Sequence, residues 1–161
     1  MDYVKQREWS DQFLPQIKKI LAPYTIETAD FDTDTYCATD LIANPKHIAV
    51  RMRRYEHYLK HGNCFVMRSR TKTGNKTELQ KIIDGLADWM FYGFATEDEK
   101  DIVDWFLIDL RSWRSHMIRN KKNIKYGEIK NDDGSAFVWF DILSFEGEPK
   151  LLISRKILDK N

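Results

Sequence analysis

The clearest strand pattern in the chain is a short run in which apolar and polar residues alternate. Ile48, Val50 and Met52 lie on one side of an extended backbone, and Arg51 and Arg53 lie on the other. A period of two fits a β-strand and does not fit a helix. The sequence therefore predicts a strand whose arginine face must meet solvent, a carboxylate or a partner.

A second alternating run covers residues 65–70 and places Arg68 and Arg70 on one face. A charged segment at 56–61, interpreted as a loop, and a Gly62-Asn63 turn separate it from the first run. Joined as an antiparallel hairpin, the two strands would gather all four arginines on one surface. The alternative is a solvated sheet face that is balanced by nearby carboxylates.

The remaining apolar patterns predict helices and strands linked by short turns. An amphipathic helix covers residues 3–21, with a kink or a new start at Pro15 and an end at Pro23. Short strands are expected at 25–29 and 36–42. After the two alternating runs we expect a helix opened by Thr77 and then a buried strand at 88–94 in the centre of the sheet. A strand to Asp109 and a helix to His116 follow. The chain ends with a hairpin of 124–130 and 136–143 and an edge strand or helix at 150–157. A single helix also fits residues 102–117, so both interpretations stay open there.

The helix opened by Thr77 carries local signals at both ends. Thr77 and Gln80 have the spacing of a capping box, and Gly85 is placed to end the helix. Glu78 and Lys81, three residues apart, lie together on its flank. Its apolar residues are expected to form one buried stripe: Leu79, Ile82, Ile83 and Leu86.

Composition narrows the class of protein. A chain of 161 residues that is 42% apolar is long enough for a single domain with a real core. No run of about 18 apolar residues occurs and the N-terminus is polar, so we expect no membrane span, no secretory signal and a cytoplasmic protein. Cys37 and Cys64 lack a metal-binding spacing and are expected to be reduced, buried thiols. The tryptophans that lie in apolar patterns are expected in the core: Trp89, Trp105, Trp113 and Trp139.

Charge is distributed unevenly along a nearly neutral chain. Residues 25–45 contain five acidic residues and no Lys or Arg, whereas residues 46–81 contain ten basic residues against two acidic ones, a net charge of +8. The whole chain has a net charge of only +1, so the rest sums to −7. Such local asymmetry points to a partner more than the total does, and phosphate is the group that forked, permanently charged guanidinium groups suit best.

The order of elements up to residue 94 is helix, three strands, a further hairpin strand, helix and strand, with Asp40 at the end of the second strand. This order resembles the core of the PD-(D/E)XK nuclease-like superfamily. The segments Ile48–Arg53, Thr77–Ile82 and Gly85–Gly93 also look like those of a phage-borne or prophage-borne group assigned to that superfamily. The likeness covers a little over half of the chain, and its motifs are short.

The resemblance implies an α/β (α+β) fold in a single domain, with a central mixed β-sheet and flanking helices. Residues 1–94 would form the restriction-endonuclease-like αβββαβ core, and residues 95–161 would extend the sheet with a C-terminal β-hairpin. It also implies a cleft in which a carboxylate pair binds magnesium, because a hard cation prefers oxygen ligands and activates water for attack on phosphate.

The catalytic pattern of the superfamily is only partly present. Asp40 matches its second-strand acid, but the third strand reads Arg51-Met52-Arg53 where an acid and a lysine two residues later are expected. Arginine neither ligates magnesium nor acts as a base at ordinary pH. The superfamily sometimes moves these groups to the next helix, which implies Asp40 and Glu78 as metal ligands and Lys81 as the water-activating cation. The alternative is an exposed Glu78–Lys81 ion pair worth a few tenths of a kcal/mol.

Three functions are consistent with these observations. The first is a magnesium-dependent endonuclease that acts on DNA. The second is a DNA-binding or other nucleic-acid-binding protein on the same scaffold whose chemistry is lost, which accounts for its predicted contact residues without a metal: Arg51, Arg53, Arg68 and Arg70. The third is a phage-encoded protein that blocks a host factor through an aromatic interface. His57 and His61 are four residues apart but fall in an expected loop, so no metal site is predicted there.

Overall fold

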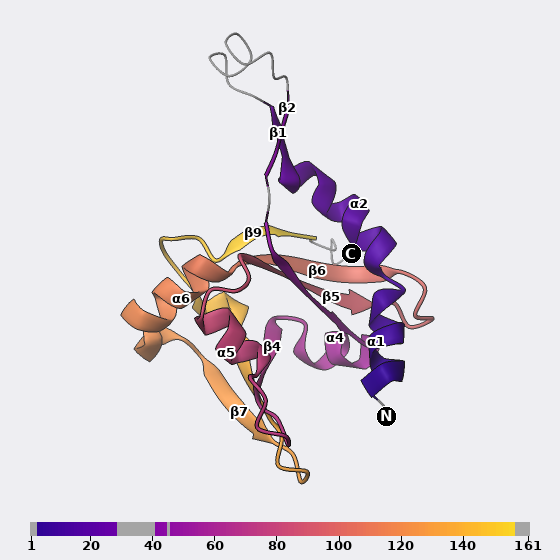
Figure 1. Cartoon of the computed structure of the whole chain (residues 1–161). Coiled ribbons are helices and arrows are strands. Elements are labelled where there is room, and N and C mark those ends of the chain that lie inside the picture. The colour runs from indigo at the N-terminus through magenta and orange to yellow at the C-terminus, as the bar shows by residue number, and fades with distance from the viewer. Residues whose placement is uncertain (1–2, 29–40, 45, 157–161) are drawn as a thin grey trace. The chain divides into compact units, whose positions relative to one another are not determined.

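The computed structural model describes residues 3–28, 41–44 and 46–156 (Figure 1). The predicted strand at 36–42 lies mostly outside the described residues, and so does the candidate metal ligand Asp40. The chain divides into two compact units, residues 1–46 and residues 47–161. Each unit is described by itself.

The first unit contains two helices and a small hairpin. Helix α1 (Tyr3–Asp11) and helix α2 (Leu14–Thr25) replace the single predicted helix, and β1 (Ile26–Thr28) pairs antiparallel with β2 (Leu41–Ala43). The break falls just before Pro15, which confirms that this proline starts a second half.

The apolar stripe of this helical segment is confirmed, because Phe13, Ile17 and Leu21 are buried. The predicted end at Pro23 is wrong, since α2 continues to Thr25. Proline removes one backbone donor near the end of the helix. In the last turn the Thr25 hydroxyl donates at 3.4 Å to the Leu21 carbonyl.

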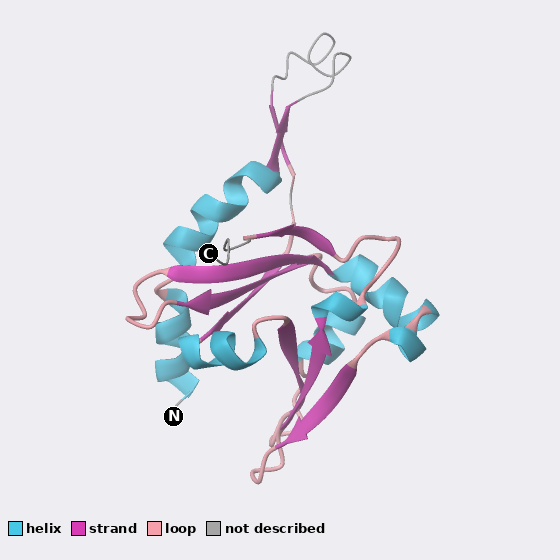
Figure 2. Cartoon of the chain, turned by 180° about the vertical axis from the view of Figure 1, so that it is seen from behind, coloured by secondary structure: helices cyan, strands magenta, loops and turns pink. Residues whose placement is uncertain are grey.

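The second unit is a mixed α+β structure with two sheets (Figure 2). The larger sheet has the order β3-β5-β6-β9, in which only the β3–β5 pair is parallel. The smaller sheet is antiparallel, with the order β4-β8-β7. The strands are β3 (Ile48–Arg53), β4 (Cys64–Arg70), β5 (Trp89–Ala95), β6 (Ile102–Asp109), β7 (Tyr126–Lys130), β8 (Ala136–Asp141) and β9 (Leu152–Arg155).

Three helices and two 3₁₀ turns connect these strands. They are α4 (Tyr55–His61), α5 (Glu78–Ile83), α6 (Leu110–Arg119), η1 (Lys121–Asn123) and η2 (Ile142–Ser144). None of the helices in the described ranges is long and apolar enough to cross a membrane.

Most local predictions in this unit are confirmed. Every residue of β5 is buried and β5 lies inside its sheet, as expected of the central strand. Residues 102–117 form a strand followed by a helix, and the Asp109 side chain caps that helix by accepting the Ser112 N–H at 2.7 Å. The last segment is an edge strand.

The predicted hairpin of β3 and β4 is wrong. The segment expected to be a loop forms α4, and the two strands on either side of it belong to different sheets. Strand β3 pairs instead with β5 in parallel, and β4 pairs with β8. The four arginines therefore do not share a hairpin face.

The capping box of α5 is confirmed: Thr77 and Gln80 exchange hydrogen bonds at 3.2 Å and 2.8 Å. Its predicted buried stripe is partly wrong. Ile82 is 2% exposed, but Ile83 is 55% exposed and Leu86 is 58% exposed. The helix ends at Ile83, so Leu86, which was predicted to belong to its buried stripe, lies beyond the last helical turn.

One core joins the two sheets of this unit. On the larger sheet, β5 and β6 contribute Met90, Tyr92, Phe94, Phe106 and Ile108 to it. On the smaller sheet, alternate residues of β4 and β8 contribute Phe65, Met67 and Phe140. Side chains of a strand alternate between faces, so the neighbours of these residues along β4 and β8 point to the other face of the smaller sheet.

Candidate nucleic-acid interface

The candidate catalytic acid Glu78 is held by two donors at the start of α5. Its carboxylate forms an ion pair with Arg51 and accepts the backbone N–H of Arg68 at 3.1 Å. Lys81 is exposed and forms no ion pair with Glu78. The predicted Glu78–Lys81 ion pair is therefore wrong, because Glu78 is neutralised from β3 and not from its own helix.

The Arg51 guanidinium and the Arg68 N–H bind the same Glu78 oxygen, so a metal ion at that oxygen would compete with a cation that is already there. The assignment of Glu78 to magnesium stays a prediction. Among the residues that the structure describes, no three His, Cys, Asp or Glu side chains are close enough to hold a metal ion. Asp40, the second proposed ligand, lies outside that part of the chain.

Three of the four candidate arginines contact either Glu78 or Tyr92. Arg51 and the backbone of Arg68 meet at Glu78, and Arg53 donates from Nε to the Tyr92 hydroxyl at 2.9 Å. The Nε atoms of Arg51 and Arg68 are buried and have no hydrogen-bond partner within the described residues. Unsatisfied buried donors of a cation favour an anion nearby.

Arg70 is the exception. The register of β4 shifts between Arg68 and Arg70, and Arg70 is exposed. The bulge therefore removes this arginine from the group that the sequence pattern assigned to one face.

The face of the smaller sheet that points away from the core carries an unusual set of side chains. Cross-strand neighbours form three rows in the order β4, β8, β7. The rows are Cys64–Asp141–Lys125, Val66–Trp139–Gly127 and Arg68–Phe137–Ile129. We call this surface the open face.

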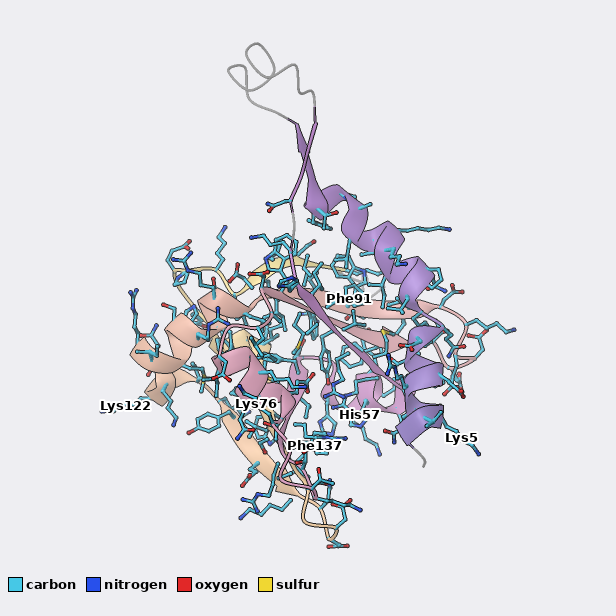
Figure 3. All side chains as sticks on the ribbon, viewed as in Figure 1. Lys5, His57, Lys76, Phe91, Lys122 and Phe137 are labelled. Atoms are coloured by element: carbon cyan, nitrogen blue, oxygen red, sulfur yellow. The ribbon has the colours of Figure 1, made fainter. Side chains whose placement is uncertain are left out.

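Two aromatic side chains dominate the open face. Phe137 and Trp139 are only partly buried, and the Arg68 guanidinium carbon lies 5.2 Å from the centre of the Phe137 ring. Figure 3 labels Phe137 on this sheet and His57 on α4. The prediction that every tryptophan in an apolar pattern is core is wrong for Trp139. It is confirmed for the other three, with exposures of 8%, 8% and 2% for Trp89, Trp105 and Trp113.

A glycine positions the indole of Trp139. A Cβ atom at Gly127, the cross-strand neighbour of Trp139, would lie 2.7 Å from the indole Nε1. No real Cβ contact is that short, so the ring lies across β7 in space that only glycine leaves. The flat indole is therefore presented along the sheet.

The open face borders a pocket of about 370 Å³. Residues of both sheets and of α4 line it. The walls combine aromatic and aliphatic side chains with a few polar groups. The lining residues are His57, His61, Cys64, Val66, Tyr92, Phe94, Lys125, Ile129, Trp139 and Asp141. Pockets of this size and composition are typical of small-ligand sites.

Burial and neighbouring charges change the protonation of two pocket residues. Partial burial, the Arg53 guanidinium and then His61 lower the pKa of His57 below its ordinary value of 6.5. Burial and the Asp141 carboxylate raise the pKa of the Cys64 thiol. Cys64 is a free, half-buried thiol, and its raised pKa disfavours the thiolate that a nucleophile needs.

Sequence reasoning missed the open face, although a signal was present. In β8 the alternation places Ala136, Val138 and Phe140 on one face, and Phe137, Trp139 and Asp141 on the other. Both faces contain aromatic residues, so the alternation alone does not show which face is core. Asp141 at the end of the second set was the clue that this face is not core.

No known protein family, no curated protein and no solved structure matches this chain. The function of the site is therefore argued from its own geometry and chemistry.

Proposed function

We propose that the protein binds single-stranded nucleic acid on the open face of its smaller sheet. The observation that carries this proposal is the pair of partly exposed aromatic rings, Phe137 and Trp139, on the same sheet face as Arg68 and Lys125. Every base has a flat π-face, and stacking on aromatic side chains together with backbone contacts from cations is how sequence-tolerant single-strand binders work.

The charge around this surface supports the same partner. The segment 46–81, which supplies one edge of the open face and the adjoining α4, has a net charge of +8. Of the charged residues on the open face itself, Arg68 and Lys125 are cationic and Asp141 is the one carboxylate. A phosphate backbone gains most from such a surface by releasing its counterions.

Unpaired bases fit this site better than a duplex does. In a duplex the faces of the bases are covered by stacking, and only their edges are accessible in the grooves. The rings of the open face lie on strands and the adjoining pocket is lined by aromatic residues, which suits bases that have been splayed out of a stack.

Binding is favoured over cleavage by the state of Glu78. Its carboxylate, which the resemblance to the nuclease-like superfamily assigned to magnesium, is held by Arg51 and the Arg68 N–H. Arginine in that position contacts an anion but supplies neither a ligand nor a base. We therefore propose the nucleic-acid-binding hypothesis without metal-dependent chemistry.

The test uses short labelled single-stranded DNA and RNA and the corresponding duplexes, titrated with the full-length chain in a fluorescence anisotropy assay. We expect both single strands to bind more tightly than the duplexes and their affinity to fall steeply with salt. Phe137→Ala should weaken single-strand binding about 5- to 150-fold, the equivalent of about 1–3 kcal/mol for one stacked base.

The matched control is Tyr126→Ala, which removes a 42% exposed aromatic ring from the same sheet but from its other face. It should leave the affinity unchanged. Equal losses from Phe137→Ala and Tyr126→Ala, or no binding to any oligonucleotide, would contradict the proposal and favour a protein partner for the exposed rings.

A further inference from the structure

The pocket beside the open face has two opposite charges on one wall. Asp141 and Lys125 both line it, and they are neighbours, because the Asp141 backbone N–H donates to the Lys125 carbonyl at 2.9 Å. Neither side chain forms an ion pair with any described residue. One Asp141 oxygen caps η2 by accepting the Leu143 N–H at 3.0 Å, and the carboxylate keeps further lone pairs on both oxygens for other donors.

The other walls are apolar and aromatic. Val66, Phe94 and Trp139 line the pocket together with the ring of Tyr92, whose hydroxyl is already held by Arg53. A volume of about 370 Å³ is at the small end of the usual range for ligand pockets. It suits one planar heterocycle with its sugar, and not a peptide or a lipid chain.

The geometry points to guanine as the base that this pocket takes. This inference rests on the proposed function, because it assigns the identity of one base in the bound strand. The Watson–Crick edge of guanine presents an acceptor, O6, next to two donors, N1–H and the N2 amino group. A carboxylate accepts the two donors and an ammonium donates to O6, which matches Asp141 and Lys125, two pocket-lining residues joined by a backbone hydrogen bond.

The other bases fit the same wall less well. Adenine offers its amino donor to Asp141 and its N1 acceptor to Lys125, and uracil and thymine offer N3–H and a carbonyl oxygen. Each of these bases therefore donates one hydrogen bond to the carboxylate where guanine donates two. The missing hydrogen bond to a charged group costs affinity.

The test is isothermal titration of the full-length chain with three probes, GMP, IMP and AMP. GMP should bind at least about tenfold more tightly than AMP, and each tenfold step corresponds to about 1.4 kcal/mol. IMP should bind more weakly than GMP, because it keeps O6 and N1–H but lacks the amino group.

Asp141→Asn is the diagnostic variant. Asparagine keeps the size of the side chain and remains a good cap for the Leu143 N–H, so the fold has no reason to change. GMP affinity should fall by more than AMP affinity, because guanine has two hydrogen bonds to the carboxylate to lose and adenine has one. The control is Asp132→Asn, which removes an exposed carboxylate from the turn between β7 and β8.

A second measurement does not depend on any pocket variant. In a Cys37→Ser background, Cys64 is the single thiol of the chain and lines the pocket. GMP should protect Cys64 from alkylation by iodoacetamide, and AMP at the same concentration should protect it less. If Asp141→Asn fails to fold, this protection decides the matter.

Equal affinity for GMP and AMP, or Cys64 protection that is the same for both, overturns the inference. Oligonucleotides separate it from the proposed function. If oligonucleotides with and without guanine bind equally well, the proposed function stands and the guanine inference is wrong. If GMP binds tightly and no oligonucleotide binds, the proposed function is wrong and the guanine inference stands.

Discussion

The two faces of the β4-β8-β7 sheet share the same backbone but differ in what their side chains do. On the core face, Phe65 and Phe140 are 0% and 1% exposed and their rings stack at 5.2 Å between centres. On the open face, Phe137 and Trp139 occupy the alternate positions of the same strand and remain partly exposed. Aromatic rings held at a surface contribute less to stability than buried ones, so the two faces should respond differently to loss of a ring.

The largest predicted effect tests whether the core face carries the stability. Phe140→Ala removes a fully buried ring that packs against Phe65, Trp113 and Phe145. We expect the free energy of unfolding to fall by about 3–5 kcal/mol. Phe137→Ala, three residues earlier in the same strand and on the other face, should cost less than about 1 kcal/mol. Urea denaturation of both variants gives the comparison.

That comparison fails if the two variants are equally destabilised. The open face would then be part of the core, and the exposure of Phe137 would have no functional meaning. A large loss of oligonucleotide binding with near wild-type stability is expected only for Phe137→Ala.

The second prediction concerns the link between β3, β4 and α5. Glu78→Gln removes the charge that Arg51 faces but keeps an acceptor for the Arg68 N–H. Because both side chains of the ion pair are about a quarter exposed, with values of 25% and 22%, we expect a loss of about 1–2 kcal/mol and not the full cost of breaking a buried pair. Thermal unfolding measures it.

Lys81→Gln is the matched control for Glu78→Gln, since Lys81 is an exposed charge on the same helix. Its effect should be within about 0.5 kcal/mol. A larger effect of Lys81→Gln than of Glu78→Gln would mean that the helix flank, and not the contact with β3, is what matters.

The third prediction tests the orientation of the indole on the open face. Gly127→Ala puts a Cβ atom 2.7 Å from the Trp139 Nε1, so the ring must move. We expect a stability loss of about 1 kcal/mol, a shifted indole N–H resonance for Trp139, and weaker single-strand binding. Glu128→Ala, the next residue on the other face of β7, should leave the resonance in place.

The smallest predicted effect is a pH dependence from His57. Burial, Arg53 and His61 lower its pKa in the folded protein, and nearby Lys60 acts the same way while Glu56 opposes them. The folded state therefore prefers the neutral ring. This contribution to stability is complete above the ordinary value of 6.5 and is lost as the pH falls through the lowered pKa.

His57→Gln should flatten this part of the stability profile by less than about 1 kcal/mol between about pH 7.5 and about pH 5.5, measured by urea denaturation. His47→Gln, which removes an exposed histidine outside the pocket, is the control. If His57→Gln retained the full slope, the pH dependence would have another origin.

Local signals were sufficient for much of the secondary structure. The alternation at Ile48–Arg53 gave β3 with its bounds, and the capping box at Thr77 gave the start of α5. The missed helix α4 has no buried residue, so it has no apolar stripe for a periodicity argument to detect. Its charge-rich sequence was interpreted as a loop for that reason.

The candidate site was less accessible from the sequence. Arg51, Arg53 and Arg68 were singled out because of their spacing, and the structure brings them to Glu78 and Tyr92. The hairpin expected to join them does not exist, because β3 pairs with β5, about 40 residues later in the chain. The alternation of apolar and polar residues in a strand does not indicate which distant strand it pairs with.

The sequence by itself determined most of the strands and helices other than α4, and where the positive charge lies, because periodicity, caps and composition act over a few neighbouring residues. Only the tertiary structure decided which face of each strand is core. It also decided that Asp141 and Lys125 meet at one pocket wall and that Gly127 makes room for Trp139. The physical reason is that a strand has two equivalent faces until other strands and helices cover one of them.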